Sequence, residues 1–115
     1  MTTVATRDQR ISIRVTVDTY IRAAVVHKAS GIKGHGWVRN LSAGGLFVDS
    51  QDTFDADEPV IVDALARAGE TAIHLRVDGW VAYRSPEGVG IQFGHLSPEM
   101  AERITELIDL FSRTG

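Results

Sequence analysis

The alternating stretch ISIRVTVDTYIR, residues 11–22, decides the fold class of this chain. Its apolar side chains point to one side of an extended backbone and its polar side chains to the other. A period of two is typical of a β-strand that lays one face on a core. The pattern continues through residues 23–26 and breaks near Ser30-Gly31, so we predict one continuous strand up to that point.

Further strands are predicted downstream wherever short apolar or alternating runs are bounded by turn-forming residues. These runs cover residues 36–41, 46–48, 60–62, 72–84 and 89–93. Tight turns are predicted at 42–45 and 85–88, and the acidic stretch 49–59 is predicted to be a surface loop. Asp78-Gly79 suggests a bulge inside the 72–84 strand.

The C-terminal stretch changes to a helical period. Ser97 is a suitable N-cap and Pro98 suits the first helical position. Apolar residues then recur at helical spacing, at Met100, Ile104, Leu107, Ile108 and Phe111. Six short strands and one amphipathic helix predict a mainly β fold, a six-stranded antiparallel barrel with the helix packed on it. The apolar stripe then covers the barrel; the alternative, a dimer or partner surface, leaves an exposed hydrophobic patch.

Length and composition favour one compact domain. The chain has 115 residues, of which 43% are hydrophobic and 23% charged, enough for a real core without cross-links. We expect a flexible arm at 1–9 and a single domain at 10–115. The chain has no cysteine, which excludes disulfides, thiolate metal sites and thiol nucleophiles. It has no apolar run long enough to span a bilayer and no recognisable signal peptide, so a cytoplasmic location is expected.

Charge is unevenly distributed along the chain. Residues 1–45 carry seven basic and two acidic groups (+7 − 2 = +5), whereas residues 46–115 carry five basic and thirteen acidic groups (+5 − 13 = −8). The total of −3 argues against a general nucleic-acid binder, whose surface is usually basic throughout. The basic N-terminal part is compatible with a local anion site.

Two short motifs carry residues suited to binding. Arg10 and Arg14 lie four positions apart, and an arginine fork bonds bidentately to phosphate oxygens or to the O6 and N7 edge of guanine. Residues 40–45, NLSAGG, place short polar side chains and two glycines at a strand end, where a ligand can approach the backbone closely. Taken singly, the first motif is more typical of an exposed strand edge than of a binding site, and the second is more typical of an ordinary turn whose glycines supply positive φ.

Together the two motifs resemble the PilZ family. Its signature is an arginine, three residues and an arginine, followed some tens of residues later by Asp or Asn, any residue, Ser, two residues and Gly. The matching positions are Arg10, Arg14, Asn40, Ser42 and Gly45. The resemblance extends to IRVTVD at 13–18, GWVAYR at 79–84 and GVGIQF at 88–93, and so covers nearly the whole chain.

The resemblance implies a barrel that binds cyclic di-GMP, a bacterial second messenger, without acting on it chemically. It implies that Arg10 and Arg14 grip the phosphates and the guanine Hoogsteen edge or face. It further implies that Asn40 and Ser42 hydrogen-bond guanine and that Gly45 keeps the turn open. Arg7, Gln9 and Gly44 are further candidates for the site. Many members have an arginine where this chain has Gln9, so the resemblance leaves one or two nucleotides per chain open.

We therefore expect a receptor that transmits the signal to a separate downstream protein. In this reading the phosphates draw the arm ending at Arg10 onto the 40–45 turn and create a new surface. The alternative is a PilZ-type interaction module that works without nucleotide. A second copy of the chain is a further candidate partner, whereas DNA, RNA and membrane spans are not expected.

No residue pattern points to catalysis, a metal or a cofactor. The four histidines are scattered, and the acidic residues at 49–58 lack the order of a calcium loop. The glycine pairs at 34–36 and 88–90 do not follow a strand and open a helix, so a dinucleotide fold is not supported. We expect no enzyme and no resident cofactor.

Overall fold

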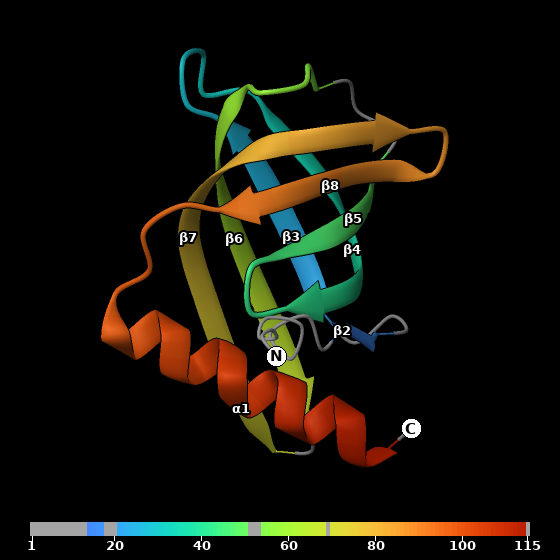
Figure 1. The fold of residues 1–115 in the computed structure, drawn as a ribbon, viewed down its shortest axis with the longest axis vertical. Helices are drawn as coiled ribbons and strands as arrows, with labels where there is room; N and C mark the ends of the chain where they lie inside the picture. The colour runs from blue at the N-terminus through green and yellow to red at the C-terminus, as the bar shows by residue number, and fades with distance from the viewer. Residues whose placement is uncertain (1–13, 18–20, 51–53, 69, 115) are drawn as a thin grey trace, which may run out of the picture.

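The computed structural model describes residues 14–17, 21–50, 54–68 and 70–114. Within these residues the chain forms seven strands followed by one helix (Figure 1). In chain order they are β2 (Arg14–Thr16), β3 (Ile21–His27), β4 (Lys33–Ser42), β5 (Gly45–Ser50), β6 (Pro59–Ala68), β7 (Thr71–Ser85), β8 (Gly88–Phe93) and α1 (Pro98–Thr114).

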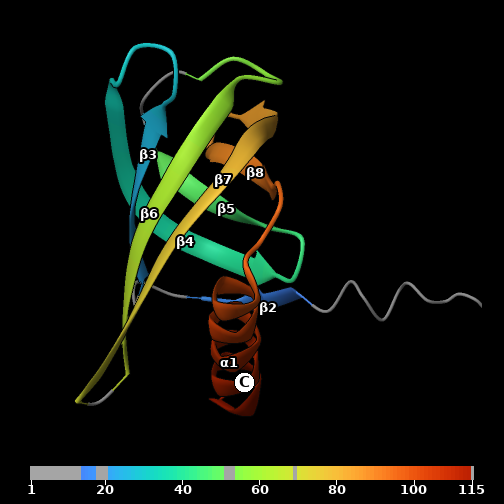
Figure 2. The same cartoon turned by 90° about the vertical axis from the view of Figure 1, so that its left-hand side faces the viewer.

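The strands close into a barrel. All pairings are antiparallel and run in the order β4-β3-β6-β7-β8-β5, and β5 pairs back with β4 to close the ring of six. The short strand β2 adds to the C-terminal end of β4. Figures 1 and 2 place α1 across one end of this barrel. The predicted six-stranded antiparallel barrel with a C-terminal helix is confirmed.

The single long first strand predicted from the alternation is wrong. Both β2 and β3 pair with β4, but Thr16 faces Asn40 and Arg22 faces Trp37. Six steps along the first segment (22 − 16) therefore match only three along β4 (40 − 37). The register of β3 with β4 is therefore shifted by three residues relative to that of β2, and the described pairing of β3 with β4 begins at Arg22. Val17 and Ile21 are nevertheless both buried, so the predicted inward face is correct.

The predicted bulge at Asp78-Gly79 is also misplaced. Pairing of β7 with β6 runs through both residues without interruption. The irregularity lies on the other edge, where Val81 faces Ile91 but Tyr83 faces Gly90, so Ala82 is the extra residue. Alternation along β7 ends at this bulge: Val81 is buried, and Ala82, Tyr83 and Arg84 are all exposed. The bulge thus turns Tyr83 onto the outer surface.

The barrel interior is filled by the inward-facing residues of every strand. Val25, Val38 and Val62 are fully buried, as are Val81 and, unexpectedly, Phe54. The stretch 49–59 was predicted to be a surface loop, but Phe54 folds inward and its ring stacks on His27, with centroids 4.4 Å apart. Burial of the Phe54 ring stabilises the fold relative to leaving the ring in water, even though its sequence neighbours are polar.

The helix begins as the sequence predicts. The Ser97 hydroxyl accepts a hydrogen bond from the Met100 amide (3.1 Å), which is N-cap geometry. Ile104 and Leu107 are buried, and Met100, Ile108 and Phe111 pack against the same core. The outer side of α1 is charged, so in its described residues the exposed hydrophobic patch of the alternative interpretation is not seen. No helix among the described residues has the length and apolar character needed to cross a membrane.

Candidate functional site

The turn between β4 and β5 holds the second sequence motif, and we call residues 40–45 the hairpin corner. Ser42 and Gly45 are register partners that close the turn. The Ser42 side chain is buried, and its hydroxyl donates to the Gly45 carbonyl (3.3 Å). The serine therefore holds the turn itself, while its oxygen keeps lone pairs for a further hydrogen bond.

The two glycines of the corner differ in what they require. Neither has the positive φ expected from the sequence. A Cβ at Gly45 would lie 2.2 Å from the Ile91 carbonyl oxygen of β8, so only glycine fits where β5 meets β8. A Cβ at Gly44 would meet nothing within 4 Å. Close approach of two backbones, rather than backbone conformation, explains Gly45.

Arg14 reaches the same corner from β2. It faces Ser42 across the strand pair, and its Nη1 donates to the Asn40 side-chain oxygen. The acceptor is a neutral amide, so the interaction orients the guanidinium without cancelling its charge. Arg14 is exposed and keeps an anion-binding character.

The corner opens onto a pocket of about 550 Å³, which we call the corner pocket. Arg14, Ser42, Gly44 and Gly45 line one side. The other side consists of residues from β7 and β8, namely Ala82, Tyr83, Gly90, Ile91 and Gln92. Four of the five predicted residues that the structure describes therefore face one cavity, whose volume is typical of a small-molecule site.

A second pocket of about 790 Å³ adjoins the first, and we call it the side pocket. Its lining includes the fifth predicted residue, Asn40, together with Phe47, Glu87 and Tyr83. Tyr83 lines both pockets, is 52% exposed, and stacks its ring on Phe47 at 6.1 Å between centroids. An exposed aromatic ring between two pockets is suited to stack on a planar base.

Sequence reasoning missed Tyr83 and Gln92. Both belong to strands that are distant in sequence from the two motifs, and only barrel closure brings β8 beside β5. The one sequence feature linked to Tyr83 is Gly90, the second glycine of GVGIQF. In the structure, a Cβ at position 90 would lie 2.2 Å from Cε1 of Tyr83. The glycine leaves space for the ring, so these two positions depend on one another.

A second arginine near the corner is engaged differently. Arg39 donates through Nε to Asp49 Oδ2 (2.7 Å), and its Nη2 lies 2.6 Å from the same oxygen. The other carboxylate oxygen of Asp49 accepts the Trp37 amide (2.6 Å). We call this arrangement the β4–β5 lock, because it joins the two strands and matches the charge of Arg39 with a carboxylate.

Three predicted site residues, Arg7, Gln9 and Arg10, lie outside the described residues. Arg10 precedes Arg14 by four positions, so chain geometry keeps their Cα atoms within about 14 Å.

A separate group of titratable side chains lies on the loop that precedes β6. Glu58 lies on the far loop, where the Asp55 amide donates to it (3.0 Å) and His27 pairs with it. The pKa of Glu58 is lowered, chiefly by the hydrogen bond from the Asp55 backbone and further by His27. Among the residues with described positions, no three His, Asp or Glu side chains gather as a metal site.

Comparisons with known proteins agree with this architecture. A family profile described as the PilZ domain matches residues 6–110. The PilZ domain of CeSA from a cellulose-synthesizing bacterium superimposes with a TM-score of 0.66 at 14% identity, covering 88% of this chain and 99% of that one. No curated protein sequence matches.

Two more solved structures share the fold. The PilZ domain with c-di-GMP of YcgR from Escherichia coli has a TM-score of 0.67 at 12% identity, with 90% of this chain and 91% of that chain covered. The inhibitor of motility MotI/DgrA from Bacillus subtilis has a TM-score of 0.65 at 15% identity. There, 88% of this chain covers 49% of the longer protein.

Proposed function

Since this chain belongs to the PilZ domain family, we propose that it is a receptor for cyclic di-GMP and binds it at the corner pocket. The observation that carries the proposal is the meeting of Arg14 with the hairpin corner. Two motifs 26 residues apart in sequence are joined by the hydrogen bond from Arg14 to Asn40. A solved relative, the YcgR domain, is described with the same dinucleotide.

The ligand's chemistry matches the groups around the pocket. Cyclic di-GMP carries two phosphate charges and two planar guanines. Arg14, oriented by Asn40, offers a fork to a phosphate or to the Hoogsteen edge of guanine. The ring of Tyr83 provides a stacking surface, and the Ser42 hydroxyl and corner backbone lie beside it.

Arg10 is proposed as the second phosphate ligand. Within about 14 Å of Arg14, it can address the other phosphate of an elongated ligand or converge on the same one. Binding would then fix the segment that precedes β2 against the corner. We propose that this altered surface, without any reaction on the nucleotide, transmits the signal to a downstream protein in the cytoplasm.

Isothermal titration calorimetry with cyclic di-GMP tests the proposal. Hydrogen bonds to charged groups contribute about 1.5–3 kcal/mol, so Arg14→Ala should weaken binding at least about tenfold. Arg14→Lys should not restore it, because lysine lacks the planar fork. Arg84→Ala, another exposed arginine outside both pockets, is the matched control and should bind like the unmodified protein.

Cyclic di-AMP serves as the control ligand, because it has the same charge but a different base edge. Selective binding of the guanine form is expected, and the molar ratio reports whether one or two nucleotides bind. Unchanged affinity in Arg14→Ala would refute the assigned site. Absence of any binding would instead favour a nucleotide-independent interaction module.

A further inference from the structure

The outer surface of the barrel carries a basic face away from both pockets. It is formed by the outward residues of β3, β6 and the first half of both β4 and β7, and we call it the sheet face. Arg22 faces Leu65, which faces His74; one row along, Ala24 faces Asp63, which faces Arg76. Its exposed basic residues, among those described, are Arg22, Lys33, Arg67 and Arg76.

Asp63 is the acidic group that neutralises part of this face. It pairs with His74 through one oxygen and with Arg76 through the other (3.1 Å). Lys28 and Asp78 pair with each other at 3.6 Å and cancel. Four basic residues less Asp63 leave the sheet face with a charge of +3 (4 − 1), in a chain whose total is −3.

The outer side of α1 has the opposite charge, and we call it the helix face. Four acidic residues and one arginine line a hollow of about 680 Å³ there, namely Glu99, Glu102, Glu106, Asp109 and Arg103. Their sum is −3 (1 − 4), equal and opposite to that of the sheet face.

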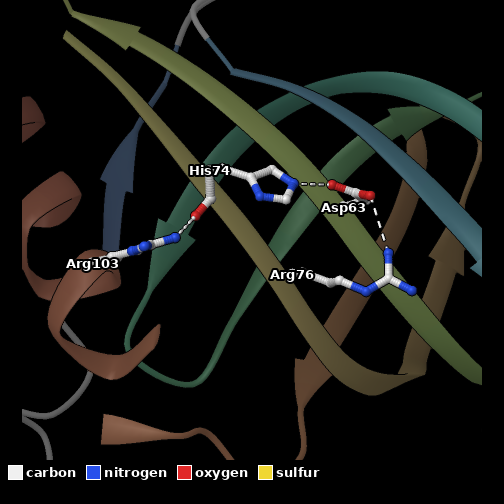
Figure 3. Close-up of polar contacts among 4 residues, drawn as sticks. All are labelled: Asp63, His74, Arg76 and Arg103. Carbon is white, nitrogen blue, oxygen red and sulfur yellow. Dashed lines mark hydrogen bonds and ion pairs between the residues drawn. The ribbon is translucent and has the colours of Figure 1, made fainter. Parts of the chain in front are cut away.

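The two faces meet along one line. Arg103 of α1 donates through Nη1 to the His74 carbonyl of β7 (2.7 Å) and through Nη2 to Glu99 (2.7 Å). Figure 3 shows Arg103 beside His74, with Arg76 on the same strand, β7, and Asp63 on the adjoining strand β6. A basic and an acidic surface therefore lie side by side on one molecule, with their boundary at His74 and Arg103.

We propose that these faces bind a second copy of this chain in a two-fold symmetric dimer. In such an interface each contact occurs twice, so a surface that is basic on one side of the axis and acidic on the other complements itself. The acidic helix of each copy lies on the basic sheet of the other. This pairing does not depend on the proposed nucleotide.

The sheet face also offers the kind of side chains found at protein interfaces. Arg22 stacks over the ring of Trp37, at 4.9 Å from its centroid. Leu65 is 38% exposed, and Trp80, just beyond the sheet face on β7, is 37% exposed. Tryptophan and arginine are enriched at binding hot spots, so the dimer contact combines apolar area with charge.

A charge-swap experiment tests the pairing on the full chain without nucleotide. One variant reverses the sheet face (Arg67→Glu with Arg76→Glu), and the other reverses the helix face (Glu102→Arg with Glu106→Arg). Sedimentation equilibrium is measured at protein concentrations up to about 1 mM. The unmodified protein should form dimers in this range, whereas each variant alone should stay monomeric. An equimolar mixture of the two variants should form dimers again, because the acidic sheet then meets a basic helix.

The control pair reverses two charges outside both faces, Arg84→Glu and Glu87→Arg, and should leave the dimer unchanged. Raising salt from about 0.1 M to about 1 M shortens the screening length from about 10 Å to about 3 Å and should dissociate the dimer. Circular dichroism melting confirms that every variant folds. A monomeric unmodified protein at low salt, dimers in either single variant, or a mixture that stays monomeric would each overturn the proposal.

Discussion

Arg14 and Arg39 lie near the same end of β4 but are held in opposite ways. Arg39 is matched by the Asp49 carboxylate, which also accepts a backbone amide, so its charge serves the fold. Arg14 is oriented by the neutral side chain of Asn40 and keeps its charge for an outside anion. The charge of the acceptor therefore determines whether each arginine mainly stabilises the fold or remains able to bind an anion.

Gly45→Ala should cause the largest loss of stability, because it distorts the hairpin corner that Arg14 contacts. The new Cβ would lie 2.2 Å from a backbone oxygen of Ile91, and backbone cannot move aside cheaply. We expect a loss of about 3 kcal/mol in the free energy of unfolding, measured in urea. Gly44→Ala is the matched control and should change stability by less than about 0.5 kcal/mol. Equal stability of the two variants would contradict this account of the corner.

Asp49 and Asn40, the acceptors of the two arginines, are expected to differ in what their removal costs. Asp49→Ala removes the partner of Arg39 and leaves the Trp37 amide without its bond, so stability should fall by about 2 kcal/mol. Asn40→Ala should change stability by less than about 0.5 kcal/mol but weaken cyclic di-GMP binding severalfold. Urea unfolding and calorimetry on both variants separate the two roles. The comparison fails if Asn40→Ala costs as much stability as Asp49→Ala.

Variants of Tyr83 test whether a residue other than Arg14 also contributes to cyclic di-GMP binding. Stacking of a base on an aromatic ring contributes about 1–3 kcal/mol, so Tyr83→Ala should reduce affinity by about tenfold. Tyr83→Phe keeps the ring and should bind almost normally. The ring's part in binding is disproved by a phenylalanine variant as weak as the alanine variant.

The smallest expected effect on stability comes from Glu58, and it depends on pH. Its pKa is lowered in the folded chain, first by the Asp55 amide and then by His27. A carboxylate with a lowered pKa stabilises the fold above its unfolded pKa, and this contribution is lost as pH falls through the folded value. Glu58→Gln should therefore lose less stability than the unmodified protein when acidified below about pH 4.3. Identical acid unfolding curves would argue against this role.

Alternation and capping signals predicted the strands, the barrel and the helix start, since these depend on local periodicity. The pairing of β2 and β3 with β4 was not predictable, because a three-residue offset leaves the apolar alternation looking continuous. Phe54 was missed because its polar neighbours hid a residue that only a distant core accommodates.

The candidate site was predictable only as far as its motifs extend in sequence. Arg14, Asn40, Ser42 and Gly45 were predicted because their two motifs resemble the PilZ signature. Tyr83 reaches the pocket through the bulge at Ala82, and Asp49 meets Arg39 across a hairpin. Such contacts depend on strand register, which periodicity does not specify.

Backbone amide NMR shifts during titration with cyclic di-GMP test whether the corner pocket is the binding site. The largest shifts should fall around the corner pocket, at residues 40–46, 82–83 and 90–92, while the amides of β3 and β6 should stay almost unchanged. Saturable binding whose shifts centre on β3 and β6, with the corner unaffected, would contradict this assignment.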